Sequence, residues 1–255
     1  MLLRKEGFRQ DAVLARAAAD AGGLALTGLR ATGSSKGLGE RGDALSHQTI
    51  LGVLGDARPE DAVLSEEAAD DCARLSAPRV WIVDPLDGTR EYAEVGRTDW
   101  AVHVALWSHG DLVAGAVALP GVGVTLCTDD PPTVPATTQR KLRIAVSRTR
   151  PPSFIPALAR HLNAELVPLG SAGYKIAAVI RGEVDAYVHG GGQYEWDSAA
   201  PVAVAWSAGL HASRLNGAPL VYNSPDPLLP DLIVCRPELA AALLDGVASA
   251  MAGQR

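Results

Sequence analysis

Several features that mark particular classes of protein are scarce or missing in this sequence. Its 255 residues include only three cysteines, which lie far apart and form no C-x-x-C pair. That pattern argues against a disulfide scaffold and against a zinc site, and it favours a reducing, cytoplasmic setting. The formal net charge is −6 and no long basic tract is present, so we expect no nucleic-acid partner. No apolar run approaches the roughly 18 residues of a membrane-spanning helix, so we also expect no membrane partner.

What the chain does contain is typical of a globular protein. Hydrophobic residues make up 47% of the sequence and charged residues 20%, while aromatic residues contribute only 5%. The length is sufficient for one large domain or two small ones with a real core. A stretch rich in Pro and Thr at residues 128–139 is interpreted as a linker. We therefore expect an N-terminal α+β half over residues 1–139 and a C-terminal α/β half over residues 140–255.

Hydrophobic periodicity predicts a chain in which helices and strands alternate. The first half begins with a helix at residues 11–26, with Asp11 as its N-cap, and a second helix within residues 44–64, with Gly55 at its end. Strands are then expected at residues 79–84, 99–107, 111–119 and 122–127, with an antiparallel hairpin across the short turn at residue 109. In the second half the strands are expected at residues 142–147, 164–169, 183–189 and 230–236. Helices between them predict a parallel or mixed sheet that helices cover.

The stretch VWIVDPLDGT at residues 80–89 ends an apolar strand with two carboxylates. Buried strands do not tolerate unpaired charge, so Asp84 and Asp87 need a compensating partner. Pro85 interrupts the strand ladder, which allows the two carboxylates to converge and frees the carbonyl of Leu86 as a neutral oxygen ligand. Two carboxylates and a carbonyl form a hard-oxygen cluster that suits Mg²⁺ or Mn²⁺ rather than zinc.

The next two residues could bind an anion beside this cluster. Gly88 permits close approach of the backbone to a ligand, and Thr89 supplies a hydroxyl. If a helical turn begins at Thr89, the N–H groups of Gly88 and Thr89 form an anion site.

Further carboxylates would join the cluster only if the fold brings them together. Glu66 and Glu67 follow the apolar segment at residues 61–64, and Asp43 and Asp197 stand at the expected starts of two helices. Taken alone, Glu66 and Glu67 are typical of a solvated acidic turn. Asp43 and Asp197, taken alone, are typical of helix N-caps.

Three segments together resemble the inositol monophosphatase superfamily. They are LSEE at residues 64–67, WIVDPLDGT at residues 81–89 and WDSAAPVAVAWSAG at residues 196–209, and the similarity covers nearly the whole chain. The resemblance implies a layered αβαβα fold and a Mg²⁺-dependent, lithium-sensitive phosphatase that acts on a phosphorylated small molecule. Within the superfamily, SAGYK at residues 171–175 resembles an element of the subgroup that hydrolyses 3′-phosphoadenosine 5′-phosphate in sulfate assimilation. The segments at residues 80–92, 96–107 and 191–201 look most like the actinobacterial form of that subgroup.

The resemblance also implies roles for individual residues. Glu66, Asp84 and the Leu86 carbonyl would hold one Mg²⁺, and Asp84, Asp87 and Asp197 would hold a second, with a weaker third ion beside Glu66 and Mn²⁺ as a substitute. Thr89 and Asp43 would orient the attacking water.

Substrate choice must come from residues outside the metal cluster. A bisphosphate needs a basic group at a distance, and Lys175 is the first candidate, followed by Arg97. Glu195 could bind a sugar hydroxyl, and the segment at residues 189–196 would form a flexible specificity loop. The predicted substrate-binding residues are Gly88, Thr89, Arg97, Ser171, Lys175, Glu195 and Asp197. His103 fits a strand pattern and is expected to be a satisfied core or interface residue.

Other functions stay open at this point. One is an inositol-1-phosphate or fructose-1,6-bisphosphate phosphatase, and another is a metal-binding regulatory protein without turnover. Family members are often dimers, so a homodimer is a further expectation of the resemblance.

Overall fold

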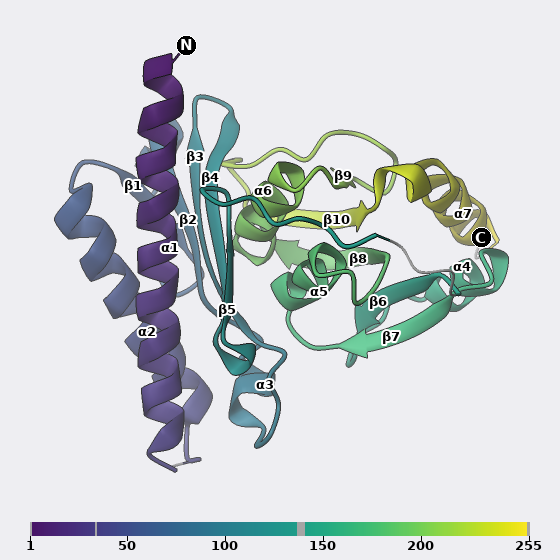
Figure 1. The fold of residues 1–255 in the computed structure, drawn as a ribbon, viewed down its shortest axis with the longest axis horizontal. Coiled ribbons are helices and arrows are strands. Elements are labelled where there is room, and N and C mark those ends of the chain that lie inside the picture. The colour runs from purple at the N-terminus through teal and green to yellow at the C-terminus, as the bar shows by residue number, and fades with distance from the viewer. Residues whose placement is uncertain (1, 34, 137–140, 254–255) are drawn as a thin grey trace.

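The computed structural model describes residues 2–33, 35–136 and 141–253, and these form five layers (Figure 1). A pair of helices covers one face of a first sheet, a second pair lies between the two sheets, and a third pair covers the far face of the second sheet. A hydrophobic cluster fills each space between the outer helices and a sheet, and another fills the space between the sheets. The predicted αβαβα sandwich with mixed sheets is confirmed.

The first sheet has the strand order β1-β2-β3-β4-β5. β1 runs parallel to β2, and the other neighbours are antiparallel, including the predicted hairpin of β3 and β4. The strands are β1 (Ala62–Ser65), β2 (Arg79–Asp87), β3 (Ala101–Ser108), β4 (Asp111–Leu119) and β5 (Val124–Cys127). Nearly every side chain of β2 and β3 is buried, because helices cover both faces of this sheet.

The outer face of the first sheet is covered by α1 (Leu2–Ala31) and α2 (Leu38–Ala57). Small residues, among them Ala12, Ala15 and Ala19, line the buried face of α1, so that the helix lies close to β4. By length and composition alone, the helical segment Phe8–Ala31 could also cross a membrane. This was not predicted from the sequence, because the segment is not an unbroken apolar run. In this fold that segment packs its alanine face on the sheet.

The second sheet has the order β7-β6-β8-β10-β9 and mixes parallel with antiparallel pairs. Its strands are β6 (Arg143–Ser147), β7 (Glu165–Leu169), β8 (Ala186–Tyr194), β9 (His211–Ser213) and β10 (Leu228–Cys235). Between the sheets lie α5 (Ala172–Ile180) and α6 (Ala199–Ser207), and on the outer face lie α4 (Ile155–His161) and α7 (Ala240–Ala252). Because α5 is enclosed by both sheets, every one of its residues is buried.

Short helical segments connect these elements. They are α3 (Thr89–Ala93) and the 3₁₀ turns η1 (Cys72–Ser76), η2 (Pro120–Val122), η3 (Glu195–Asp197) and η4 (Pro237–Leu239). Two of them, α3 and η3, carry residues of the site described below.

The start predicted for the first helix was wrong. Asp11 lies in the middle of α1 and is 2% exposed. Its carboxylate accepts hydrogen bonds from the guanidinium groups of Arg58 and Arg79. An aspartate before an apolar pattern is typical of an N-cap, but here the ion pairs with the two arginines account for it.

The second helix also differs from the prediction. It begins at Leu38 after Gly37, so Asp43 lies in its second turn rather than at its start, and it runs past Gly55 to Ala57. Residues 62–64, which fall within the range predicted for this helix, belong to β1 (Ala62–Ser65) instead. The segment begins with three consecutive apolar residues, and a short apolar run cannot be distinguished from a buried helix segment by periodicity alone.

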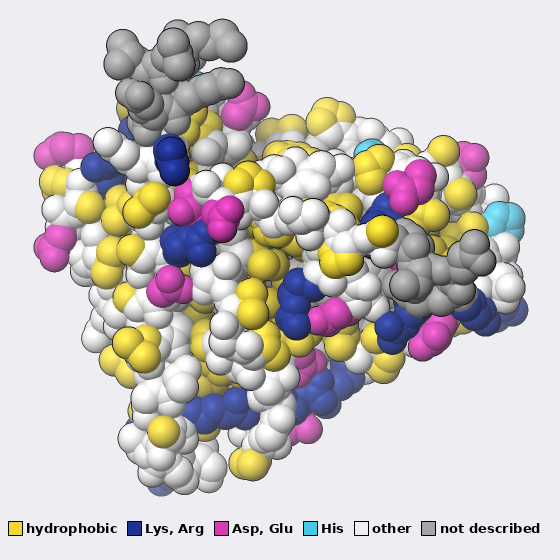
Figure 2. All heavy atoms as spheres, viewed as in Figure 1, with side chains coloured by type: hydrophobic (Ala, Val, Ile, Leu, Met, Phe, Trp, Pro, Cys, Tyr) yellow, Lys and Arg dark blue, Asp and Glu magenta, His cyan; other side chains and the backbone are white. Residues whose placement is uncertain are grey.

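The predicted boundary between residues 139 and 140 lies outside the described residues. The two sheets fall on either side of it, and side chains from both halves share the hydrophobic cluster between the sheets. On the face of the molecule shown in Figure 2, basic and acidic side chains are interspersed, and hydrophobic side chains are scattered over the surface.

Candidate active site

A bulge in β2 brings Asp84 and Asp87 to the same side of the first sheet. Asp84 pairs with His103 of β3, and Asp87 pairs with a residue only two positions away along β3. On a regular strand, side chains three positions apart point to opposite faces of the sheet. The extra residue in β2 shifts this alternation, so Asp84 and Asp87 point to the same face. Pro85 has no N–H for the ladder, and its carbonyl accepts a hydrogen bond from Ser46 Oγ at 2.7 Å. The expected convergence of the two acids is therefore present, although β2 continues to Asp87 instead of ending at Asp84.

Two more acids reach the same place from other elements. Glu66 follows β1 directly, and its N–H donates to the carbonyl of Val83 in β2 at 3.3 Å. Asp197 ends η3, and its carboxylate accepts a hydrogen bond from the N–H of Tyr194 at 2.7 Å. Both line one cavity together with the acids of β2.

The four carboxylates destabilise one another as anions. Burial raises the pKa of Asp84 well above its usual value, and the charges of Glu66, Asp87 and Asp197 add to this effect. Burial and neighbouring acids likewise raise the pKa of Glu66 to about 7 and that of Asp197 to about 7. A divalent cation would remove this repulsion, and a donor set made only of oxygens fits Mg²⁺ or Mn²⁺.

The N-terminus of α5 is fitted closely to Asp87. The N–H of Ala172 donates to Oδ1 at 3.0 Å, while the N–H of Gly173 and the hydroxyl of Ser171 donate to Oδ2 at 2.6 and 2.5 Å. Across from this helix, Gly88 has a φ of +91°, and a Cβ there would lie 3.1 Å from the Cβ of Ser171. Glycine is therefore required where the chain turns from β2 into α3.

Thr89 and Asp43 form a pair at one wall of the site. The Thr89 hydroxyl lies 3.3 Å from the carbonyl oxygen of Leu86 and also within hydrogen-bonding reach of Asp43, which is buried behind it in α2, and its one proton can be donated to either acceptor. Burial and the charge of Glu67 raise the pKa of Asp43 to about 7, and the hydrogen bond with Thr89 opposes this shift. Among the described residues that line the cavity, Thr89 is present and Asp43 is not, so Asp43 reaches the site through Thr89.

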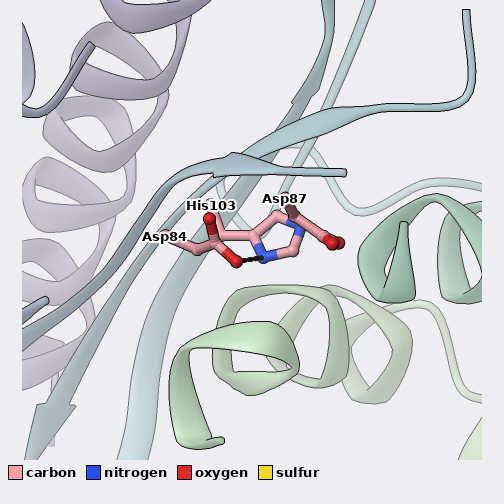
Figure 3. A group of neighbouring side chains, drawn as sticks. All are labelled: Asp84, Asp87 and His103. Atoms are coloured by element: carbon pink, nitrogen blue, oxygen red, sulfur yellow. Dashed lines mark ion pairs between the residues drawn. The ribbon is translucent and has the colours of Figure 1, made fainter. Parts of the chain in front are cut away.

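His103 lies between the two carboxylates of β2 (Figure 3). Its Nδ1 is 3.1 Å from the carbonyl oxygen of Trp196 and 3.9 Å from Asp84 Oδ2. Its Nε2 is 3.4 Å from Asp87 Oδ2 and has no hydrogen-bond partner among the described residues. Burial lowers the pKa of His103, which favours the neutral ring. The sequence predicted a satisfied core or interface histidine; the side chain is fully buried, but it contacts the acid cluster and only one ring nitrogen is satisfied.

The opposite wall of the cavity, which has a volume of about 290 Å³, is basic. Arg148 and Arg150 follow β6, and Arg148 is paired with Glu91 of α3 at 2.7 Å. Arg150 is exposed at the wall. Arginines directly after a strand were visible in the sequence, but nothing there indicated that the end of β6 faces β2.

Lys175 is enclosed beneath this wall. Its ammonium group donates to the carbonyls of Gly170 at 3.0 Å and Ser171 at 2.5 Å and lies 5.2 Å from the ring centre of Tyr187. Burial lowers the pKa of Lys175 to about 8, although surrounding carboxylates oppose the shift. The lysine therefore holds the two backbone carbonyls that precede α5 and adds positive charge beneath the cavity.

Most of the predicted site residues line the cavity: Glu66, Asp84, Leu86, Asp87, Gly88, Thr89, Ser171, Lys175 and Asp197. Arg97 and Glu195 are not among the described lining residues. Arg97 is paired with Asp99. The Glu195 carboxylate accepts hydrogen bonds from the N–H groups of Asn223 at 2.6 Å and Ser224 at 2.8 Å, so it holds a loop.

Comparison with known proteins gives consistent matches over most of the chain. The model of the inositol monophosphatase family matches residues 11–251. A 3′-phosphoadenosine 5′-phosphate phosphatase of Mycobacterium tuberculosis is 54% identical over 221 residues, covering 84% of this chain and 83% of the relative. The protein of that name from Mycobacterium leprae is 49% identical over 249 residues, covering 92% of both chains. The crystal structure of CysQ from Bacteroides thetaiotaomicron superposes with a TM-score of 0.75 at 26% identity, covering 90% of this chain and 98% of that chain.

Proposed function

Because the chain belongs to the inositol monophosphatase family, we propose that it is a Mg²⁺-dependent phosphatase that hydrolyses the 3′-phosphate of 3′-phosphoadenosine 5′-phosphate. The observation that carries this proposal is the meeting of Glu66, Asp84, Asp87 and Asp197 in one cavity with a basic opposite wall. The relatives at 49% and 54% identity bear the name of this activity. The related substrate 3′-phosphoadenylyl sulfate offers the same 3′-phosphate.

The family resemblance implies the metal ligands, and their shared cavity supports the assignment. Glu66, Asp84 and the carbonyl of Leu86 would hold one ion, Asp84, Asp87 and Asp197 would hold a second, and a third would lie beside Glu66. Bound Mg²⁺ supplies Lewis-acid chemistry, since it neutralises phosphoryl oxygens and activates water as the nucleophile. Mn²⁺ is expected to substitute because it accepts the same oxygen donors.

The side chains of the wall orient the reactants. The Thr89 hydroxyl binds the attacking water, and Asp43 behind it holds the hydroxyl in place. The N–H groups of Gly88 and Thr89 donate to phosphoryl oxygens as the phosphate transfers, which stabilises the developing charge. Direct attack by water then requires no covalent intermediate with the protein.

The second phosphate of the substrate needs a separate cation. Lys175 and Arg97 were the candidates from the sequence, but Lys175 already donates to two backbone carbonyls and Arg97 is paired with Asp99. Arg150 is exposed at the cavity wall, and a guanidinium group matches the geometry of a phosphate. We assign the 5′-phosphate to Arg150, with Lys175 contributing its charge from beneath.

The test is phosphate release from 3′-phosphoadenosine 5′-phosphate, inositol-1-phosphate and fructose-1,6-bisphosphate, each with and without Mg²⁺ and Li⁺. We expect a clear preference for the nucleotide in kcat/KM, dependence on Mg²⁺ and inhibition by Li⁺. Arg150→Ala should lower kcat/KM on the nucleotide by roughly tenfold, the effect of one charged hydrogen bond, and leave inositol-1-phosphate hydrolysis nearly unchanged. Arg160→Ala in α4, which is also exposed, is the matched control. A preference for inositol-1-phosphate would reverse the assignment of substrate.

A metal-binding protein without turnover is the alternative from another class. Mg²⁺-dependent phosphate release by the wild type separates the two, and Asp87→Asn should abolish that release while the protein remains folded. Unchanged release from this variant would remove Asp87 from the ligands. We also propose that the protein works in the cytoplasm in sulfur assimilation and forms a homodimer, and its three free cysteines support a reducing compartment.

A further inference from the structure

We propose that His103 is a positioning residue of the metal centre, which joins the segment that carries Asp197 to the first sheet through a hydrogen bond from its Nδ1–H to the carbonyl of Trp196. The inference rests on the proposed metal-dependent function. It concerns how the ligand set is assembled, and it adds no ligand to that set.

Asp197 reaches the site from a distant part of the chain. It lies on η3, whereas Asp84 and Asp87 lie on β2 of the first sheet. On one side η3 is held by Glu195, which binds the N–H groups of the loop at residues 223–224. On the other side the bond from His103 to Trp196 connects it to β3, across a sequence separation of 93 residues.

The direction of this bond follows from its acceptor. A carbonyl oxygen can only accept, so Nδ1 of His103 carries the ring proton and Nε2 presents a lone pair in the neutral ring. The lone pair faces Asp87 Oδ2 at 3.4 Å, which is a contact between two acceptors and no hydrogen bond. The bond that holds structure together is therefore the one to Trp196.

Nε2 also has no room to coordinate an ion. A Cβ built on Gly173 would lie 1.9 Å from Nε2, which means that the imidazole fills the space where a side chain at Gly173 would project. Asp87 Oδ2, on the same side, is already bound by Ser171 and Gly173. His103 is thus packed between β2 and α5 as a spacer, with its one donor aimed at the carbonyl next to Asp197.

The consequence concerns metal affinity. Mg²⁺ requires its ligand oxygens at about 2.0–2.1 Å in near-ideal geometry, so a small displacement of η3 removes Asp197 from the coordination sphere. Loss of partners that orient metal ligands typically lowers metal affinity by about 10–100-fold. His103 should therefore affect metal binding even when no substrate is present.

The experiment compares two replacements of His103, each of which keeps a polar atom at the position of one ring nitrogen. In His103→Asn the amide nitrogen takes the place of Nδ1 and can still donate to Trp196. In His103→Gln the polar end takes the place of Nε2 and cannot. Binding of Mg²⁺ by calorimetry and of Mn²⁺ by electron paramagnetic resonance is measured on the substrate-free protein. Val104→Ala, the next residue of β3 with its side chain on the other face of the sheet, is the control for a general loss of packing.

We expect His103→Asn to keep the metal dissociation constants within about threefold of wild type and His103→Gln to raise them by about tenfold or more. Val104→Ala should lower thermal stability and leave metal affinity unchanged. His103→Phe, which keeps the volume without a donor, should behave like His103→Gln; if it does not fold, the Asn and Gln variants still decide the matter.

Equal metal affinity in the Asn and Gln variants would overturn the proposal, and so would a wild-type protein that binds neither ion. Failure of the proposed activity gives a different result, because metal binding would then follow the expected order while no phosphate is released from any substrate.

Discussion

Replacing Asp197 with asparagine should stabilise the metal-free protein near neutral pH and should abolish its stabilisation by Mg²⁺. Burial and the neighbouring acids raise the pKa of Asp197 from 3.8 to about 7. The folded protein therefore keeps a proton that the unfolded chain loses near pH 3.8, and folded stability falls as the pH rises through this window. At pH values above the pKa of Asp197 in the folded protein, this loss of stability is complete. Asparagine cannot ionise, and its carbonyl oxygen can still accept the hydrogen bond from the N–H of Tyr194.

The magnitude follows from the size of the shift. A difference of about three pKa units corresponds to about 4 kcal/mol. Asp197 is partly exposed and shares its repulsion with the other acids, so roughly half of this, about 2 kcal/mol, is expected at pH 8. About one third of the gain should remain at pH 5, where the folded wild-type carboxyl is protonated. In a chain of this size, 2 kcal/mol corresponds to a Tm difference of about 4–8 °C.

The measurement is thermal and urea unfolding of wild type and Asp197→Asn in EDTA at pH 5 and pH 8, and again with saturating Mg²⁺. Comparing the two proteins at each pH cancels the titration of histidines, which both share. Mg²⁺ at 100 times its dissociation constant should stabilise wild type by about 2.7 kcal/mol and the variant by much less. An asparagine variant that is no more stable than wild type at pH 8 without metal, or whose gain is the same at both pH values, would refute the reasoning.

Three further predictions concern other parts of the molecule. Gly173→Ala places a Cβ 1.9 Å from His103 Nε2, so urea unfolding should show a loss of about 1–3 kcal/mol or more, together with weaker Mg²⁺ binding in calorimetry. Asp11→Ala removes the ion pairs of Asp11 with Arg58 and Arg79 and leaves Arg79 paired with Asp61, and because both arginines are partly exposed we expect a loss of about 1–2 kcal/mol in the same assay, with kcat/KM of the folded protein unchanged. Thr89→Ala should lower kcat by about 100-fold or more while the Mg²⁺ dissociation constant stays within about twofold of wild type, since Thr89 is proposed to orient water and not to bind metal.

The parts of the site that depend on residues adjacent in the chain could be predicted from the sequence. Asp84, Pro85, Leu86 and Asp87 are consecutive, so an apolar strand interrupted by proline was sufficient to predict that the two acids converge. The bulge in β2 produces that convergence in the fold. The alternation of helices and strands could also be predicted, because hydrophobic periodicity is a property of short sequence windows.

Other parts of the fold and the site could not be predicted, because no pattern of neighbouring residues indicates them. β1 begins with three consecutive apolar residues, which periodicity alone does not assign to a strand or a helix, although it is the strand that carries Glu66 to the site. His103 has the pattern of an ordinary core residue on a strand, and only its position between β2 and η3 gives it contacts with the acid cluster. Asp11 matched the pattern of an N-cap as well as that of a buried ion pair, and the sequence could not distinguish the two.

The amino-acid sequence by itself determined the alternation of helices and strands and the convergence of Asp84 and Asp87, because periodicity and motifs depend on residues that are close in the chain, and the resemblance of three segments implied the family and with it the layered fold. Only the tertiary structure decided which cations face that cluster, what binds Lys175, and how Asp197 is held beside Asp84. Those contacts join β2, β3, α5 and η3, elements separated by many residues, and their relative positions follow from how all five layers pack together.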